Sequence, residues 1–227
     1  MDKVTENTIR QEQLASYGQL IAGFSHDMKN HLGIIRESNG LMGDLIDVGG
    51  LGEDEKSVER LKKAMASIER RVIIAANMLH HLSSFAHRSD TPYSSFQIND
   101  LITEECTFLV RFSKLQQVNF ALQLEEGIHS LYNDPSLLQH VFYRMYILSL
   151  ERLSIGDNFE IITKQSGRNV EITFRIIGHL QKNLEELFDD NIMSAIKKLK
   201  GVLKIDNNIK GIAAITLSVA PLSADNK

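Results

Sequence analysis

The sequence has few of the residues that build disulfides or break helices: one cysteine, three prolines and no tryptophan in 227 residues. The single cysteine, Cys106, excludes an intramolecular disulfide and any zinc site made of cysteine pairs. Because Cys106 lies in an apolar run with Phe108 and Leu109, we expect a buried and unreactive thiol.

Long apolar stretches are also absent. No segment approaches the roughly 20 consecutive apolar residues of a membrane-spanning helix, and residues 1–8 lack the apolar core of a signal peptide. We therefore expect a cytoplasmic protein that does not enter a membrane. The net charge of −4 gives no basic field, which argues against nucleic acid and anionic membrane surfaces and leaves protein partners or a small ligand.

From residue 8 to residue 48 no proline interrupts the chain, and apolar residues recur every seven positions. Labelled as heptad positions a and d, the two rows predict one long helix packed in a bundle or coiled coil. The a row is Leu14, Ile21, Met28, Ile35 and Met42, and the d row is Tyr17, Phe24, His31, Ser38 and Leu45. Gly49, Gly50 and Gly52 should end this helix, since glycine readily takes a positive φ.

A second helix is predicted after Glu53, where apolar residues follow in alternating steps of three and four. They are Val58, Leu61, Met65, Ile68, Val72, Ala75, Leu79, Leu82 and Ala86. Two long helices joined by a short turn form an antiparallel hairpin that cannot cover its own apolar faces. We therefore predict a homodimer with a four-helix bundle. The hairpin folding back on the C-terminal half of the chain stays open as an alternative.

A polar segment that ends at Pro92 marks a linker, so residues 1–89 and 90–227 are predicted to form two domains. Beyond it, helical and strand periods alternate. Helices are predicted over residues 97–115, 135–153 and 182–200, a strand over 118–124, and two hairpins that turn at Ser166–Gly167 and Asn207–Asn208. Helices segregated from a mostly antiparallel sheet predict an α+β fold.

Two segments carry a family resemblance. Residues 24–32, F-S-H-D-M-K-N-H-L, resemble the H-box of the bacterial sensor histidine kinases, in which the first histidine accepts the phosphoryl group. Residues 134–151, D-P-S-L-L-Q-H-V-F-Y-R-M-Y-I-L-S-L-E, resemble the segment that begins the kinase ATP site. The resemblance covers residues 10–222 and implies a dimerisation and histidine-phosphotransfer hairpin followed by an α/β sandwich like the kinase ATP-binding domain.

The nucleotide site departs from the family pattern at three places. Arg144 and Leu148 replace two asparagines that help to hold magnesium in the kinases, and neither side chain has the oxygen that magnesium needs. Ile176 stands where the family has the aspartate that binds adenine. Residues 184–200 contain no glycine for a turn that cradles phosphates. We therefore expect a degenerate domain without a cofactor of its own, so that Mg²⁺ enters only with a partner.

His26 falls at heptad position f and should point into solvent, as in-line phosphoryl transfer requires. Asp27 can accept a hydrogen bond from one imidazole nitrogen or act as a base. Asn30 shares their face of the helix and could position a water molecule, and Lys29 could attract the phosphoryl group. The alternative for each of these residues is an ordinary polar side chain that is exposed on a helix and takes no part in catalysis. His31 falls in the d row and should face the bundle core.

Among proteins of this type, the chain most resembles the histidine phosphotransferases that work without ATP. This implies that His26 exchanges phosphoryl groups with aspartates of response-regulator receiver domains, and that receivers and a hybrid sensor kinase are partners. Two alternatives stay open: a pseudokinase-type regulator or phosphatase that forms no phosphohistidine, and a divergent sensor histidine kinase. No metal site is expected, because neither His26 with His31 nor His80 with His81 has the i, i+4 spacing of a helical chelate.

Overall fold

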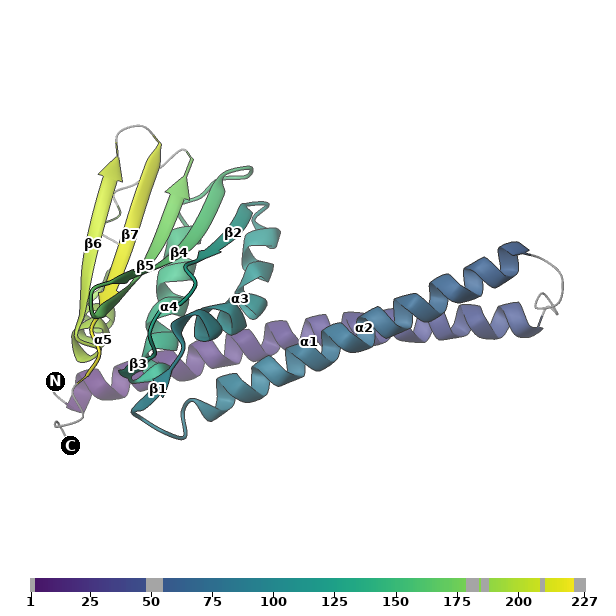
Figure 1. Ribbon diagram of the computed structural model, residues 1–227, viewed down its shortest axis with the longest axis horizontal. Coiled ribbons are helices and arrows are strands. Elements are labelled where there is room, and N and C mark those ends of the chain that lie inside the picture. The colour runs from purple at the N-terminus through teal and green to yellow at the C-terminus, as the bar shows by residue number, and fades with distance from the viewer. Residues whose placement is uncertain (1–2, 48–54, 179–183, 185–187, 209–210, 223–227) are drawn as a thin grey trace. The chain divides into compact units, whose positions relative to one another are not determined.

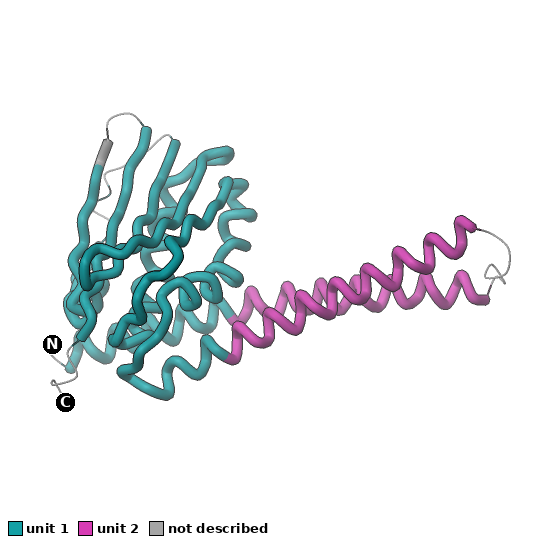
Figure 2. The backbone as a smooth tube through the Cα atoms, in the orientation of Figure 1, with its two compact units in different colours: residues 1–20, 84–227 teal, residues 21–83 magenta. Residues whose placement is uncertain are grey.

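The computed structural model describes residues 3–47, 55–178, 184, 188–208 and 211–222. The chain divides into two compact units, which are residues 1–20 together with 84–227, and residues 21–83 (Figure 2). The longest helix, α1 (Lys3–Asp47), runs through both units without a break. None of the helices in the described ranges is long and apolar enough to cross a membrane.

The unit formed by residues 21–83 is a helical hairpin of α1 and α2 (Glu55–His87) (Figure 1). Two polar contacts between the helices set its register: Ser38 Oγ donates to Ser67 Oγ at 3.4 Å, and Arg71 Nη1 lies 3.5 Å from His31 Nδ1. The predicted hairpin is therefore confirmed. The glycines expected to end the first helix lie outside the described residues.

The apolar stripe of α2 divides into two rows in the single chain. One row is half-buried and consists of Leu61, Ile68, Ala75 and Leu82. The other row is exposed by 37% to 54% and consists of Val58, Met65, Val72 and Leu79. Their spacing of seven residues places these side chains along one side of the helix, where the described residues leave them exposed.

The larger unit is built on a five-stranded sheet with the strand order β2-β4-β5-β7-β6. The strands are β2 (Asn119–Leu124), β4 (Asn158–Ser166), β5 (Asn169–Ile177), β6 (Gly201–Asn208) and β7 (Ile212–Val219). Only β2 and β4 pair in parallel, and the other neighbours are antiparallel. The predicted α+β fold and the mostly antiparallel sheet are confirmed.

One face of the sheet is covered by helices, mainly α3 (Ile98–Leu115) and α4 (Pro135–Leu150) (Figure 1). Phe142 and Tyr146 of α4 meet Phe174 and Phe159 of the sheet, with ring centroids 5.2 Å and 5.1 Å apart. All four side chains are fully or almost fully buried. Large aromatic surfaces removed from water make this the core of the unit.

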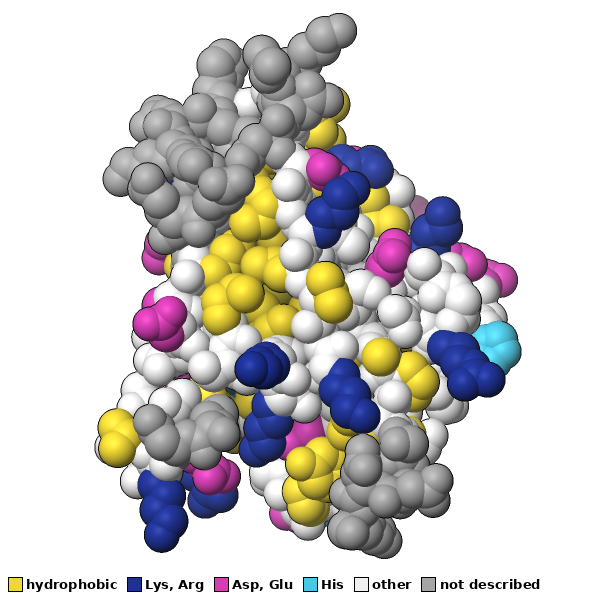
Figure 3. Space-filling model, turned by 90° about the vertical axis from the view of Figure 1, so that its left-hand side faces the viewer, with side chains coloured by type: hydrophobic (Ala, Val, Ile, Leu, Met, Phe, Trp, Pro, Cys, Tyr) yellow, Lys and Arg dark blue, Asp and Glu magenta, His cyan; other side chains and the backbone are white. Residues whose placement is uncertain are grey.

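The side of the protein in Figure 3 carries a group of hydrophobic side chains bordered by lysines and arginines. The sheet ends at β6, where Val202 is exposed. The same strand bears an exposed ion pair between Lys204 and Asp206, with 3.1 Å between nitrogen and oxygen. Charged side chains on an edge strand discourage pairing with a further strand.

Several boundaries differ from the sequence prediction. The helix expected from residue 182 begins only at Asp190, as α5 (Asp190–Lys198), because the Asp189 carboxylate caps the Ile192 N–H at 2.9 Å. Residues 182–183 and 185–187 of the expected helix lie outside the described residues. Asn207–Asn208, expected as a turn, instead end β6 and pair with Ala213 and Ile212. The turn at Ser166–Gly167 is as predicted, with Gly167 at φ +62°.

Two short strands were not predicted. β1 (Ser94–Phe96) and β3 (Leu131–Asn133) form a separate antiparallel ribbon. Each strand has only three residues, which is too short for an alternating pattern to stand out in a sequence.

The first part of α1 and the last part of α2 belong to the same unit as the sheet. Tyr17 packs edge-on against Phe85 of α2 at 4.9 Å, and Phe85 packs against Phe108 of α3 at 6.1 Å. Ile9 and Leu20 are buried. Residues 3–20 therefore pack on the C-terminal half of the chain.

Candidate functional site

The exposed histidine of the H-box-like segment is His26 on α1. Its side chain is 60% exposed, and that of Asp27 is 35% exposed. The position at heptad f therefore faces solvent, as predicted. Lys29 and Asn30 are exposed on the following turn of the helix.

Two polar groups contact the same nitrogen of this imidazole. His26 Nδ1 lies 3.2 Å from Asp27 Oδ1 and 3.3 Å from Asn30 Nδ2. The structure therefore brings together three of the predicted site residues. Both contacts are made at Nδ1, so Nε2 takes part in neither of them.

The two contacts select opposite tautomers of His26. A carboxylate only accepts hydrogen bonds, so the Asp27 contact requires a proton on Nδ1 and leaves the lone pair on Nε2. An amide nitrogen only donates, so the Asn30 contact requires a lone pair on Nδ1 and a proton on Nε2. With the proton on Nδ1, the imidazole has an exposed nucleophilic nitrogen at Nε2.

The second histidine of the segment has a different environment. His31 is half-buried, and its Nδ1 lies 3.5 Å from Arg71 Nη1 of α2. This agrees with the predicted position between the helices. Among the described residues, no group of three or more histidine, cysteine or acidic side chains is placed to hold a metal ion.

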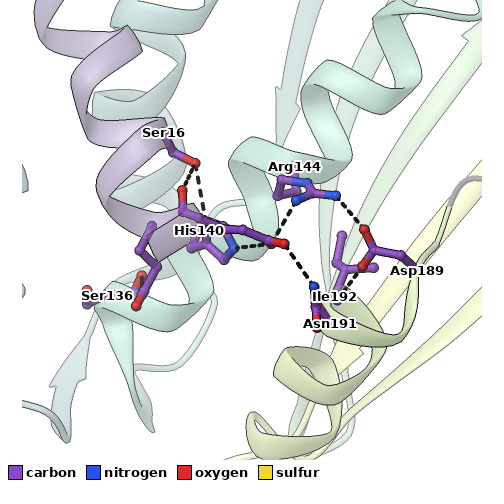
Figure 4. Close-up of polar contacts among 9 residues, drawn as sticks. Ser16, Ser136, His140, Arg144, Asp189, Asn191 and Ile192 are labelled. Atoms are coloured by element: carbon purple, nitrogen blue, oxygen red, sulfur yellow. Dashed lines mark hydrogen bonds and ion pairs between the residues drawn. The ribbon is translucent and has the colours of Figure 1, made fainter. Parts of the chain in front are cut away.

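The kinase-like segment on α4 carries an arginine that is paired within the protein. Arg144 Nη1 donates to Glu12 Oε2 of α1 at 2.8 Å, and Arg144 Nη2 donates to Asp189 Oδ2 at 2.9 Å (Figure 4). Asn191 Nδ2 donates to the other oxygen of Glu12 at 2.9 Å. A single guanidinium therefore joins α1 and the N-terminus of α5 to α4.

The charges of this network follow from burial and pairing. Burial, helped by the nearby charge of Arg144, lowers the pKa of His140 to about 4, so this imidazole is neutral at pH 7. Burial acts to raise the pKa of Asp189, but hydrogen bonds from the Ile192 backbone and the charge and hydrogen bond of Arg144 outweigh it. The pKa of Asp189 therefore lies below its ordinary value.

The side chains at the positions matched to the kinase nucleotide site offer no oxygen ligand for magnesium. Arg144 brings a cation, and Leu148 is a half-buried aliphatic side chain. Ile176, in place of the adenine-binding aspartate, is fully buried in the core. Magnesium needs oxygen ligands, and the two carboxylates nearest to Arg144 are occupied by its guanidinium. Part of the glycine-free stretch, residues 185–187, lies outside the described residues.

Sequence reasoning missed four members of this network, which are Glu12, His140, Asp189 and Asn191. Glu12 lies fourteen residues before His26 and so has the same heptad position. Arg144 stands in place of an asparagine on a mostly buried helix, and a partly buried cation is stable only with an anionic partner. That signal exists in the sequence, but it does not say which of the many carboxylates supplies the charge.

No protein-family model matches the chain. Over 182 residues the chain is 21% identical to the sensor histidine kinase ZraS of Salmonella typhimurium, and equally so to that of Salmonella typhi. The match takes in 79% of this chain but only 37% of the length of those relatives.

Solved structures of histidine kinases share the fold. Acinetobacter baumannii AdeS matches 87% of this chain and 98% of its own at a TM-score of 0.50 and 14% identity. Full-length ShkA, solved in complex with AMPPNP, matches 88% of this chain and 47% of its own at a TM-score of 0.50 and 9% identity. In sequence, over 182 residues, and in fold, the chain is similar to sensor histidine kinases.

Proposed function

We propose that the chain acts in two-component signalling as a histidine phosphotransferase, which exchanges phosphoryl groups between His26 and receiver aspartates of response regulators without using ATP. The observation that carries the proposal is the exposed His26 imidazole, held at Nδ1 by Asp27 and Asn30. The part of the proposal that excludes ATP is supported by Arg144 and Leu148, whose side chains cannot ligate the magnesium of a nucleotide.

The transfer requires few parts from this chain. Nε2 of His26 attacks the phosphorus of a receiver aspartyl phosphate in line with the bond to the aspartate oxygen. The nitrogen–phosphorus bond forms as the phosphorus–oxygen bond breaks, and the electron pair leaves with the aspartate carboxylate. The imidazole keeps its proton at Nδ1 and becomes positively charged, and the Asp27 carboxylate stabilises that charge. The reverse reaction returns the phosphoryl group to a second receiver, with Mg²⁺ supplied by the receiver.

Residues 1–89 serve in this proposal as the dimerisation and phosphotransfer hairpin. The exposed row of Val58, Met65, Val72 and Leu79 supports a homodimer, since a second hairpin would cover it. Residues 90–227 provide surface for docking rather than catalysis. We further propose a cytoplasmic site of action, with receivers and a hybrid sensor kinase as partners.

A second function is favoured by the position of Asn30. Its amide lies on the exposed face next to His26, where it could orient a water molecule toward a receiver aspartyl phosphate. The chain would then act as a phosphatase or as a pseudokinase-type regulator. Dephosphorylation of a receiver in that case depends on Asn30 and survives replacement of His26.

The test is phosphoryl transfer from a labelled receiver to the full chain, with and without ATP. The proposal predicts acid-labile label on the chain that disappears in His26→Ala and does not require ATP. Absence of label in the natural chain, or label undiminished in His26→Ala, would contradict it. Label that arises from ATP alone would identify a divergent sensor kinase instead.

A further inference from the structure

The polar network around Glu12 joins three separate elements of the unit formed by residues 1–20 and 84–227. Glu12 lies on α1, Arg144 on α4, and Asp189 and Asn191 at the start of α5. Both oxygens of Glu12 are used, one by Arg144 and the other by Asn191. Figure 4 shows Arg144 of α4 beside Asp189 and Asn191 at the start of α5.

Arg144 is the positive charge that balances this network. Its side chain is 22% exposed, and its guanidinium pairs with two carboxylates, those of Glu12 and Asp189. His140 Nε2 lies 3.7 Å from Glu12, and its Nδ1 lies 3.4 Å from Ser16 Oγ. Fixed cations between carboxylates hold separate elements together much as a bound metal ion does. Here that cation is part of the chain.

Further contacts extend the same seam along α1. Tyr17 Oη and Ser136 Oγ lie 2.9 Å apart, and Gln13 Nε2 donates to the Ser136 carbonyl at 3.4 Å. Tyr143 Oη donates to Gln19. Because these contacts follow one another over two turns of α1, the seam is a built interface with Glu12 at its most strongly charged point.

We propose that Glu12 and Arg144, together with Asp189 and Asn191, form a ligand-independent latch that fixes residues 9–20 of α1 on the α/β domain. In the kinases that the chain resembles, the helix face at Arg144 is turned to the nucleotide and its magnesium. In this chain the latch provides the attachment without either. The α/β domain and the first part of α1 therefore move as one body whether or not a nucleotide is present.

The latch has a regulatory consequence, which rests on the proposed function. Any stimulus or partner that acts on the beginning of α1 must first break the Glu12 pairs before it can shift the helix that carries His26. A partner able to do so would bring a cation for Glu12 or a carboxylate for Arg144. Control of phosphotransfer would thus operate through exchange of ion pairs.

The experiment is hydrogen–deuterium exchange on the full chain, read at residues 9–20. Glu12→Gln keeps the shape of the side chain but loses its charge, and we expect amide exchange there to rise by about tenfold. Glu6→Gln is the matched control, because Glu6 has the same charge on the same helix but pairs with the exposed Arg10 one turn away. It should leave exchange at residues 9–20 unchanged. Protection of the strands over residues 158–177 reports that each variant is folded.

A second arm tests the pair itself. Arg144→Met removes the cation while keeping the length of the side chain, and its effect should not add to that of Glu12→Gln in the double variant. Equal exchange in Glu12→Gln and Glu6→Gln, or full additivity, would overturn the latch. So would slower exchange at residues 9–20 on addition of ATP with Mg²⁺. None of these readouts involves phosphate on His26, so the proposed function can fail while the latch stands.

Discussion

Asn30 Nδ2 lies 3.3 Å from His26 Nδ1. The Asn30 side-chain amide therefore competes with the Asp27 carboxylate for the same imidazole nitrogen. The competition decides where the proton of neutral His26 resides. Asp27 favours the tautomer with a nucleophilic Nε2, and Asn30 in its present orientation favours the other. The balance between the two side chains is therefore a measurable property of the site.

Replacing the two neighbours of His26 should shift its tautomer in opposite directions. Asn30→Ala removes the competing donor and should raise the fraction of His26 with the proton on Nδ1. Asp27→Ala removes the favoured acceptor and should lower that fraction, and it should slow phosphohistidine formation by about 10- to 100-fold. Imidazole ¹⁵N chemical shifts report the tautomer, and the receiver assay reports the rate. Equal shifts in the two variants would contradict this role for Asp27.

A fully buried carboxyl makes stability depend on pH. Glu105 of α3 is 1% exposed, and burial raises its pKa to about 8, against the opposing charge of Arg88. Arg88 is itself paired with Glu104, and Glu105 also interacts electrostatically with Tyr17, Tyr143 and Cys106. In the folded protein at pH 7, Glu105 is therefore mostly protonated.

The pH dependence has a definite sign. The folded state binds the Glu105 proton more tightly than the unfolded state does. The stabilising contribution of protonated Glu105 is therefore complete below pH 4.5 and is lost as the pH rises through about 8. The loss is on the order of 5 kcal/mol. In denaturant unfolding, the free energy of unfolding of the natural chain should fall between about pH 5 and 9. Glu105→Gln should remove most of that fall. A natural chain whose stability does not fall over that interval would contradict the shifted pKa.

The sequence predicts the parts of this protein that rest on repeated local patterns. The hairpin follows from seven-residue rows, the exposure of His26 from its place between them, and the β4–β5 pair from alternation around Gly167. The Glu12–Arg144 pair joins residues 132 positions apart, and no local pattern encodes such a distance. The turn predicted at Asn207 and Asn208 is wrong for a related reason. Pairing with β7 outweighs the local turn propensity of asparagine.

Two glycines with opposite surroundings should respond in opposite ways to alanine. Gly33 lies within α1, and a Cβ there would meet no atom within 4 Å. Gly33→Ala should therefore raise the free energy of unfolding by roughly 0.5–1 kcal/mol, because alanine loses less backbone entropy in a helix. At Gly178 a Cβ would lie 2.1 Å from Asp157 Cγ, and Asp157 is held by the Ser154 N–H at 2.8 Å.

Gly178→Ala should accordingly destabilise the protein, by roughly 1–3 kcal/mol. The two variants are compared by thermal or denaturant unfolding under one set of conditions. Stabilisation by both would mean that Asp157 moves aside freely. Destabilisation by both would mean that the side of α1 at Gly33 is covered by another molecule in solution, such as a second copy of the chain.

The exposed row of α2 predicts that single charges break a dimer. Met65 and Val72 are 54% and 50% exposed on one side of the helix. Met65→Glu or Val72→Glu would place two carboxylates, one from each copy, in an apolar interface and should weaken association by on the order of 100-fold. Ile73→Glu is the matched control: Ile73 is 54% exposed but points about 100° away from Val72 around the helix. Sedimentation analysis should find Ile73→Glu dimeric and Val72→Glu largely monomeric, and equal effects of the two would place the interface elsewhere.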